Sequence, residues 1–252
     1  MSAYEVGAQG IRGAEGDSQG LYGEILKREL KGHGRLRDVT WGDNSGIMDT
    51  CVECAMGICS YSFEEFVEKV RAFHGFEAPG VIIGGYMVDL AYRCLPANGA
   101  YDALCETPKC LPDAIQLLTP CSIGNGWLVV INTGRYALIL YDKVTGEGVR
   151  VFVDTAKVDG WPEIRDWYFR TKPKKEKKIE DLLHEIREAG SAICSVQAVR
   201  VSGRFLGKKH RGAFAVCPVC RESYPAEDGP LCLGCKDGDI CVVVSPLVAG
   251  RQ

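Results

Sequence analysis

Apolar residues recur at the spacing of one helical face in the stretch that opens at Ser62. Ser62 and Glu65 form the signature of a capping box, in which the two side chains satisfy the first backbone N–H groups of a helix. The apolar stripe that follows consists of Phe63, Phe66, Val67, Val70 and Phe73. Gly75 interrupts the stripe, so the sequence predicts a helix that ends with His74 at its C-terminal end.

A second helix is predicted after Pro79-Gly80, where the sequence reads VIIGGYMVDLAYRC. This stretch is apolar nearly all round, which is typical of a buried helix. Its small residues Gly84 and Gly85 indicate close packing against neighbouring elements. A shorter helix of about two turns is predicted from Pro112, because proline suits the first position of a helix.

Strand-like segments surround the shorter helix, at 101–106, 127–131, 136–141 and 149–153. The last two are joined by a turn with Asp142, Gly146 and Gly148, which predicts a hairpin. The predicted fold class is therefore α+β, with helices packed on one face of an antiparallel sheet. A small C-terminal module of the zinc-ribbon or treble-clef type is expected to follow the sheet.

Composition divides the chain into four parts. Residues 1–45 are expected to form a flexible N-terminal extension with a short helix, and 46–170 the α+β domain. Residues 171–204 are read as a lysine-rich linker and a helix with connecting strands, and 205–252 as the zinc-binding module. The five lysines within 171–178 favour a solvated linker over a site for nucleic acid or acidic lipid, because the whole chain is acidic.

Charge and hydropathy exclude several classes of protein. The formal net charge is −3 over 252 residues, so a nucleic-acid partner is not expected. No apolar run approaches the ~20 residues that span a bilayer, and the N-terminus has no signal-peptide core. We therefore expect a cytoplasmic protein without a membrane partner.

Cysteine is the unusual component, with 13 residues, an odd number. A reducing compartment argues against disulfides and favours metal ligation or thiol chemistry. Two CxxC pairs near the C-terminus are eleven residues apart, a spacing typical of a tetrahedral zinc site, or iron in its place. The predicted ligands are Cys217, Cys220, Cys232 and Cys235. Four thiolates fill the coordination shell, so this zinc is structural.

A second cysteine cluster contains Cys51, Cys54 and Cys59. It has only three thiols and no nearby histidine, so a metal would need a further ligand. A redox pair would need a thioredoxin-like context, and a turn lined by unreactive thiols explains the cluster equally well. Three other cysteines lie in apolar surroundings and are expected to be small buried hydrophobes: Cys94, Cys194 and Cys241.

A third group of polar residues surrounds the short helix at 112–119. Cys110 and Cys121 bracket this helix, while Cys105 and Asp113 lie in the same stretch. His74 ends the helix that begins after Ser62. Taken alone, such a histidine is more often a satisfied structural residue than a ligand.

Residues 62–153 resemble the FmdE family, the E-subunit family of formylmethanofuran dehydrogenase. The resemblance rests on KCLPDAIQLLTPCSIGNGWL at 109–128 and on the hairpin NTGRYALILYDKVTGEGVRV at 132–151. It covers about half of the chain, and many family members also carry a C-terminal four-cysteine module. The family's HGHxCPG motif reads HGFEAPG here, with Phe76 and Ala78 in place of a histidine and a cysteine.

The resemblance implies a second site that holds a metal or cofactor. His74, Cys110 and Cys121 would be ligands or close neighbours, with Asp113 orienting the loop. Cys105 and Glu77 would be substitutes for the two groups that are missing. Mixed imidazole and thiolate ligation suits zinc or iron, and a bound tetrapyrrole such as heme is also chemically allowed.

Three functions follow from these residues and the resemblance. The first is a metal-binding accessory protein, expected to be a homodimer, with a redox or cofactor-handling role beside a molybdenum or tungsten enzyme system. The alternative is an enzyme that uses a cysteine thiolate or a metal-activated water at the His74, Cys110 and Cys121 site. The third is a structural protein whose second site has degenerated.

Overall fold

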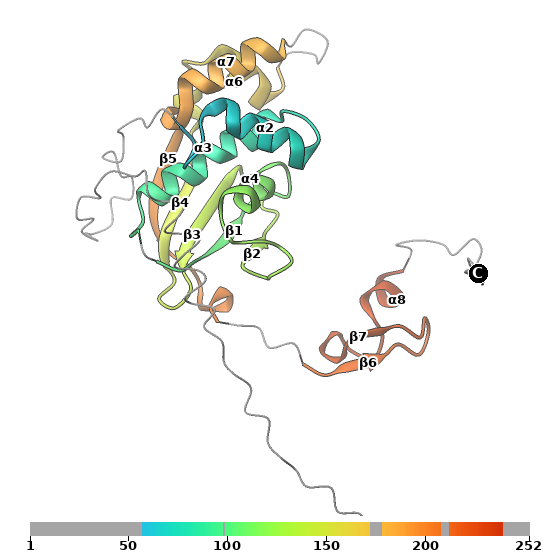
Figure 1. Ribbon diagram of the computed structural model, residues 1–252. Helices are drawn as coiled ribbons and strands as arrows, with labels where there is room; N and C mark the ends of the chain where they lie inside the picture. Colours follow the sequence, from blue (N-terminus) through green and yellow to red (C-terminus); the bar gives the residue numbers. More distant parts are fainter. Residues whose placement is uncertain (1–56, 98, 172–177, 208–211, 239–252) are drawn as a thin grey trace, which may run out of the picture. The chain divides into compact units, whose positions relative to one another are not determined.

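The computed structural model describes residues 57–97, 99–171, 178–207 and 212–238 (Figure 1). The chain divides into two compact units, residues 1–206 and 207–252, and each is described by itself. The expected N-terminal extension, most of the lysine run, Cys51, Cys54 and Cys241 lie outside the described residues. In the described part of the chain, no helix is both long and apolar enough to cross a membrane.

Six α-helices are described in the first unit. They are α2 (Phe63–His74), α3 (Pro79–Arg93), α4 (Leu111–Leu118), α5 (Thr155–Val158), α6 (Pro162–Phe169) and α7 (Ile179–Ala189). The capping box before α2 is confirmed: Ser62 Oγ accepts a hydrogen bond from the Glu65 N–H, and Glu65 Oε2 accepts one from the Ser62 N–H. Gly75 ends α2 with a φ of 94°, a conformation that glycine adopts without strain.

A five-stranded sheet forms the centre of this unit, in the order β2-β1-β3-β4-β5. The strands are β1 (Tyr101–Cys105), β2 (Leu128–Val130), β3 (Ala137–Asp142), β4 (Glu147–Val153) and β5 (Cys194–Arg200). The predicted hairpin is confirmed by the antiparallel pairing of β3 with β4. Its turn is held by Asp142, whose Oδ1 accepts the N–H groups of Val144 and Thr145. Within this sheet only the β1–β2 pair is parallel, because α4 carries the chain back between these strands.

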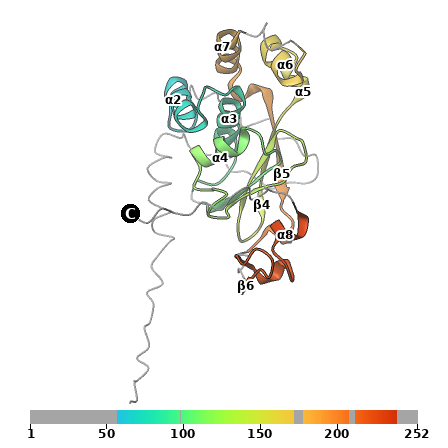
Figure 2. The same ribbon diagram turned by 90° about the vertical axis from the view of Figure 1, so that its right-hand side faces the viewer.

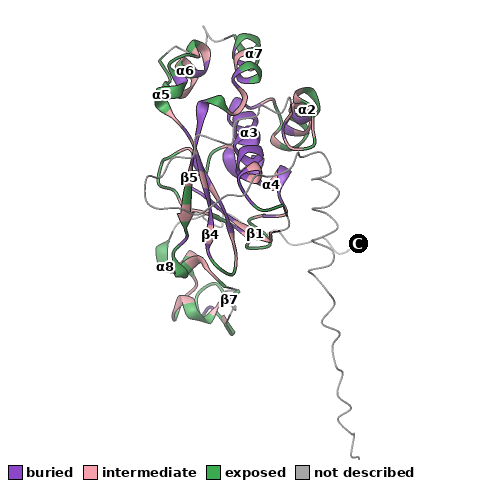
Figure 3. Cartoon of the chain, turned by 90° about the vertical axis from the view of Figure 1, so that its left-hand side faces the viewer, coloured by how far each residue is buried: buried purple, intermediate pink, exposed green. Residues whose placement is uncertain are grey.

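Helices α3 and α4 pack on one face of the sheet, which we call the inner face (Figure 2). Alternate strand residues point into this layer and are buried, among them Cys105, Leu138, Leu140, Val149 and Val151. Helix α3 is buried along almost its whole length, as predicted from its uniform apolar pattern (Figure 3). The predicted fold class is thereby confirmed.

Two glycines let α3 approach its neighbours closely. A Cβ at Gly85 would lie 2.4 Å from Phe66 Cε1 in α2, and one at Gly84 would lie 2.7 Å from Ala114 Cβ in α4. Neither gap could hold a methyl group. The two glycines therefore fix the spacing between α3 and the helices on either side of it.

The unit extends beyond the boundary at residue 170 expected from composition. Strand β5 pairs with the full length of β4, from Glu147–Arg200 to Val153–Cys194. Helix α7 packs against α6 and α3, and its Glu185 carboxylate accepts the N–H groups of Glu163 and Ile164 at the start of α6. The segment read as a linker at 171–204 therefore supplies a strand and a helix of the first unit. A local pattern cannot reveal this, because the partners lie about 50 residues apart.

The opposite, outer face of the sheet has no helix among the described residues. Glu106 lies near its centre and accepts two hydrogen bonds from Arg150, at 2.6 and 3.0 Å. A small apolar cluster lies beside this pair, with Leu104, Tyr141 and Val201 buried within it. The segment at 201–206, which includes the short helix η3 (Gly203–Phe205), borders that cluster.

The second unit is small and has little apolar core. It contains the hairpin of β6 (Phe214–Val216) and β7 (Ser223–Pro225), the turn η4 (Ala226–Asp228) and the helix α8 (Leu233–Asp237). Among its described residues only Cys217 and Tyr224 are buried, and most others are exposed (Figure 3). A module of this size needs another source of stability, such as a bound metal.

Candidate metal and cofactor sites

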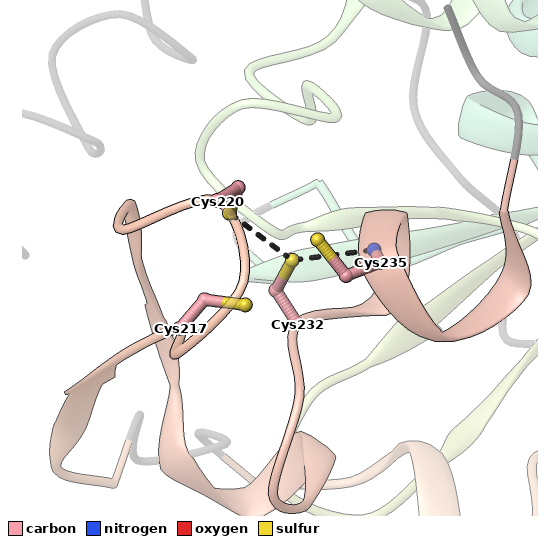
Figure 4. A group of neighbouring side chains, drawn as sticks. All are labelled: Cys217, Cys220, Cys232 and Cys235. Carbon is pink, nitrogen blue, oxygen red and sulfur yellow. Dashed lines mark hydrogen bonds between the residues drawn. The ribbon is translucent and has the colours of Figure 1, made fainter.

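Four cysteine side chains converge in the second unit, as the two CxxC pairs predict (Figure 4). Cys217 and Cys220 lie on the turn between β6 and β7, where Arg221 adopts a left-handed φ of 67° and donates its N–H to the Cys217 carbonyl. Cys232 caps α8, and its sulfur accepts the N–H of Cys235. Two short turns therefore direct four sulfur atoms toward one point.

The spacing of the sulfur atoms fits zinc. All four lie within 4.8 Å of one another, and Cys220 Sγ is 3.7 Å from Cys232 Sγ. A tetrahedron with Zn–S bonds of ~2.3 Å has edges of about 3.8 Å. These residues would hold one Zn²⁺ in a closed shell that leaves no position for a substrate.

Electrostatics in this cluster also call for a cation. Backbone N–H groups of Cys232 and Cys220 lower the pKa of Cys217 to about 6, whereas the neighbouring cysteines raise the pKa of Cys235 to about 12. Four adjacent thiolates repel one another without a positive charge between them. A divalent ion reverses this repulsion and lets all four sulfurs ionise.

The structure brings together two of the residues expected at the second site. His74 Nδ1 lies 2.6 Å from Asp113 Oδ2, which joins the end of α2 to the first turn of α4. Both side chains are partly exposed. An ionised carboxylate only accepts hydrogen bonds, so the imidazole carries its proton on Nδ1 and keeps a free lone pair on Nε2.

Cys110 lies three residues before Asp113, at the N-terminus of α4, in an unusual backbone conformation. Its φ and ψ are 56° and −50°, and the Leu111 N–H bonds to the Lys109 carbonyl across it at 2.5 Å. This is a γ-turn with positive φ, which is rare and strained for a residue with a Cβ. Such strain costs on the order of 1–3 kcal/mol and persists where the surroundings over-determine it.

The thiol of Cys110 lies against the N-terminus of α3. A Cβ at Gly80 would come within 3.1 Å of Cys110 Sγ, and Tyr136 donates its hydroxyl to the Gly80 carbonyl at 2.6 Å. Burial, followed by the charge of Asp113, raises the pKa of Cys110. A thiol in these surroundings stays protonated near neutral pH unless a cation binds it.

The two remaining cysteines of the predicted site are buried and already hydrogen-bonded. Cys105 donates its S–H to the Thr107 carbonyl at 3.1 Å, and Cys121 donates to the Tyr101 carbonyl at 3.3 Å. Burial is the main reason that their pKa values rise to about 11 and about 12. Their sulfurs point to backbone oxygens, which is typical of structural thiols.

The predicted site residues are therefore only partly assembled. His74 and Asp113 meet, with Cys110 nearby in the chain, but Cys110 and Cys121 lie at opposite ends of the eight-residue α4. That helix is about 12 Å long. Across the residues that the structure describes, the tail cysteines are the only group with three or more potential ligand atoms within 4.8 Å.

The two positions at which the chain departs from the family motif have structural roles. The Phe76 ring packs edge-on against His74, with 4.9 Å between the ring centres, and Phe76 is otherwise exposed. Ala78 is buried as the residue before α3. Glu77, considered as a substitute ligand, accepts a hydrogen bond from Arg71. Sequence reasoning missed Tyr136 and the strain at Cys110, and no local pattern signals either.

Comparisons with known proteins agree with this arrangement. Residues 73–201, half of the chain, match the family model described as FmdE, molybdenum formylmethanofuran dehydrogenase operon. This chain belongs to the FmdE family. Residues 208–241 match the FmdE treble clef zinc finger, so the C-terminal four-cysteine module is a zinc-binding module of that type.

One solved relative is similar along most of the chain. It is an FmdE-like protein of the tungsten formylmethanofuran dehydrogenase type from Syntrophus aciditrophicus, 53% identical, with a TM-score of 0.68. The match covers 75% of this chain and 100% of that one. A probable S-adenosyl-L-methionine-binding protein from Archaeoglobus fulgidus is 32% identical over 98 residues, which are 36% of this chain. The chain spans only 27% of that relative's length.

Proposed function

We propose that this FmdE-family chain is an accessory protein that binds a second metal or cofactor through His74 and Cys110. The observation that carries the proposal is the 2.6 Å contact between His74 Nδ1 and Asp113 Oδ2. Histidines that bind metals commonly donate their other ring N–H to a carboxylate, which fixes the tautomer and makes the ring a better ligand. His74 meets that condition on a partly exposed surface.

Cys110 supports the same proposal. Its strained turn holds a half-buried thiol at the junction of α3 and α4, three residues from the carboxylate that orients His74. One imidazole and one thiolate suit zinc, iron or the iron of a tetrapyrrole. Cys105 and Cys121 would join the ligands only after giving up their hydrogen bonds to backbone carbonyls.

The biological role that we propose is auxiliary. The similar protein from Syntrophus aciditrophicus is described as FmdE-like, of a tungsten formylmethanofuran dehydrogenase, which supports an association with a molybdenum or tungsten redox system. We place the protein in the cytoplasm, where reduced thiols persist. A homodimer is part of the proposal, since a second copy would add ligands to a site that one chain leaves incomplete.

Element analysis and a visible spectrum of anaerobically purified full-length protein test this proposal. We expect a metal beyond the one tail zinc per chain, or a strong visible band. His74→Ala and Cys110→Gly should each abolish that second signal and leave the tail zinc in place. Glycine suits the positive φ at position 110, so this variant removes the thiol without adding strain. Cys94→Ser, a change at a buried thiol outside the site, is the matched control.

The proposal fails if the wild-type protein holds one zinc per chain and shows no visible band. It also fails if the second metal survives both His74→Ala and Cys110→Gly. Loss of the signal in the Cys94→Ser control would mean that folding, not ligation, controls it.

An enzyme that uses the Cys110 thiolate is a second candidate. The favouring observation is the strained turn before α4, because a helix N-terminus lowers the pKa of a thiol held there. Burial and Asp113 oppose this effect. Iodoacetamide labelling of Cys110 across a range of pH distinguishes the two: a reactive nucleophile labels rapidly near neutral pH, whereas a metal-dependent thiol labels slowly until the pH exceeds about 9.

A further inference from the structure

A cavity of about 320 Å³ lies on the outer face of the sheet, away from α3 and α4. It is bounded by the ends of β1, β3 and β5, by the segment at 131–135, and by the segment at 201–206. Its lining residues are Leu104, Glu106, Ile131, Thr133, Arg135, Ile139, Val199, Arg200, Val201, Ser202, Arg204 and Phe205. None of the residues proposed for the His74 site lines this cavity, which we call the outer-face pocket.

The apolar part of the lining belongs to the sheet and to the segment that follows β5. Leu104 and Ile139 are cross-strand neighbours, and Val201 is buried beside them. The segment at 201–206 is held in place by the Val201 N–H, which donates to the Gly146 carbonyl, and by the Tyr141 hydroxyl, which donates to the Phe205 carbonyl. The pocket is therefore present before any ligand arrives.

Glu106 supplies the one negative charge of the lining, and that charge is already compensated. Arg150 binds its carboxylate with two hydrogen bonds, and Arg135 Nε lies 2.7 Å from Oε2. These partners keep the pKa of Glu106 below its ordinary value, although burial acts in the opposite direction. A ligand would meet a neutralised carboxylate at this side of the pocket.

The remaining charges of the lining are positive. Arg135 and Arg200 are 63% and 74% exposed, and Arg200 is paired with Glu147. The Arg204 guanidinium lies over the Phe205 ring, 4.7 Å from its centre, and pairs with no carboxylate among the residues that the structure describes. Three arginines against one compensated glutamate give this part of an acidic protein a local positive potential.

We propose that the outer-face pocket binds a small organic anion, an apolar body that carries one carboxylate, sulfonate or phosphate group. The apolar lining would take up the body of such a molecule. Arg204 would meet its anionic group, because a guanidinium pairs well with oxyanions. A volume of about 320 Å³ is at the small end of the range for ligand pockets. This binding site is independent of the metal site proposed at His74 and Cys110.

Fluorescence titration of the full chain with 8-anilinonaphthalene-1-sulfonate, an aromatic anion, tests the proposal. Octanoate should displace the dye, whereas octylamine and inorganic phosphate at equal concentration should not. Arg204→Glu should weaken dye binding about tenfold, which corresponds to the loss of one charge-assisted contact. Val199→Phe, which fills the pocket with a larger apolar side chain, should abolish binding. Amide chemical shifts should move on addition of octanoate at 131–139 and 199–206.

Arg165→Glu is the matched control, because Arg165 is also exposed and lies over a phenylalanine ring, that of Phe169. This variant should bind the dye as the wild type does. Unchanged binding in both Arg204→Glu and Val199→Phe would overturn the proposal, as would equal displacement by octylamine. A change of oligomeric state in Val199→Phe, measured by sedimentation, would assign the face to contact with a second copy instead. Circular dichroism of each variant verifies that it is folded.

Discussion

Glu106 lies where two arginines meet on the outer face of the sheet, and the free energy of this contact depends on its charge. The side chain is only 7% exposed and accepts hydrogen bonds from Arg150, with Arg135 and Thr133 beside it. Removing one member of a buried charge pair leaves the other without compensation. Arg150 is itself only 15% exposed, so it would bear that cost.

Glu106→Gln should lower the free energy of unfolding by about 2–3 kcal/mol near pH 7. Because the pKa of Glu106 is lower in the folded protein than its ordinary 4.5, its ionised form stabilises the fold above that pH. This stabilisation is lost as the pH falls through the lowered pKa. Urea titrations should therefore show the difference between variant and wild type shrinking below about pH 4.

Glu147→Gln provides the comparison on the same sheet. Its partner Arg200 is 74% exposed, and such surface pairs contribute roughly 0–1 kcal/mol. A loss from Glu147→Gln equal to that from Glu106→Gln would contradict the role that we assign to burial.

At single residues, the sequence indicates which side chains have the required chemistry but not which of them meet. The two CxxC pairs predict the zinc ligands because each motif forms its own turn. The second site requires contacts between α2, α3 and α4, which no local spacing specifies. The strain at Cys110 arises from such contacts, so it becomes visible only in the folded chain.

Among the elements, α3 shows how two small residues determine the packing of a whole layer. Alanine favours a helix over glycine by about 1 kcal/mol, so a Gly→Ala change in an open helix stabilises it. At Gly85 the added methyl group would meet the Phe66 ring, as well as Ile58 Cγ2 at 3.0 Å. Crowding in a closely packed core typically costs about 1–3 kcal/mol.

Gly85→Ala should therefore destabilise the first unit by about 1–2 kcal/mol, because the crowding outweighs the gain in helix propensity. Thermal unfolding followed by circular dichroism measures the change. Gly160→Ala serves as the control, since nothing lies within 4 Å of a Cβ built at Gly160. A stabilised Gly85→Ala variant would show that α2 moves away without cost.

The elements that were predicted correctly carry their signals locally. The capping box, the Gly75 stop and the turn at Asp142 each act within a few residues, and the structure confirms them. Helix α6 was not predicted, although Pro162 lies at its first turn. The parallel β1–β2 pair and the place of β5 in the sheet depend on contacts between distant parts of the chain, which hydrophobic periodicity does not encode.

In the whole molecule, the two compact units depend on different sources of stability. The first buries a large apolar cluster, whereas the described part of the second buries only Cys217 and Tyr224. Zinc binding is therefore expected to supply most of the folding free energy of the second unit.

Removal of zinc by a chelator should unfold the second unit and leave the first unchanged. Limited proteolysis should then cut within 207–252, while the thermal transition of residues 57–206 shifts by less than about 2 °C. Cys220→Ser should have the same effect, and Cys59→Ser, a change at a thiol outside the cluster, should have none. A large shift in the transition of the first unit would mean that the two units stabilise each other.

The pairing of β4 with β5 also has a consequence for biosynthesis. When the ribosome has released residues 57–153, four strands of the sheet are available, but the edge of β4 that β5 covers has no partner. Residues 154–193 must emerge before that edge can be closed, which takes about 2–10 s at usual rates of translation. During that interval the nascent chain exposes an unpaired edge strand, a known route to aggregation. Chaperone capture of ribosome-bound chains should therefore be greatest between these two points of synthesis.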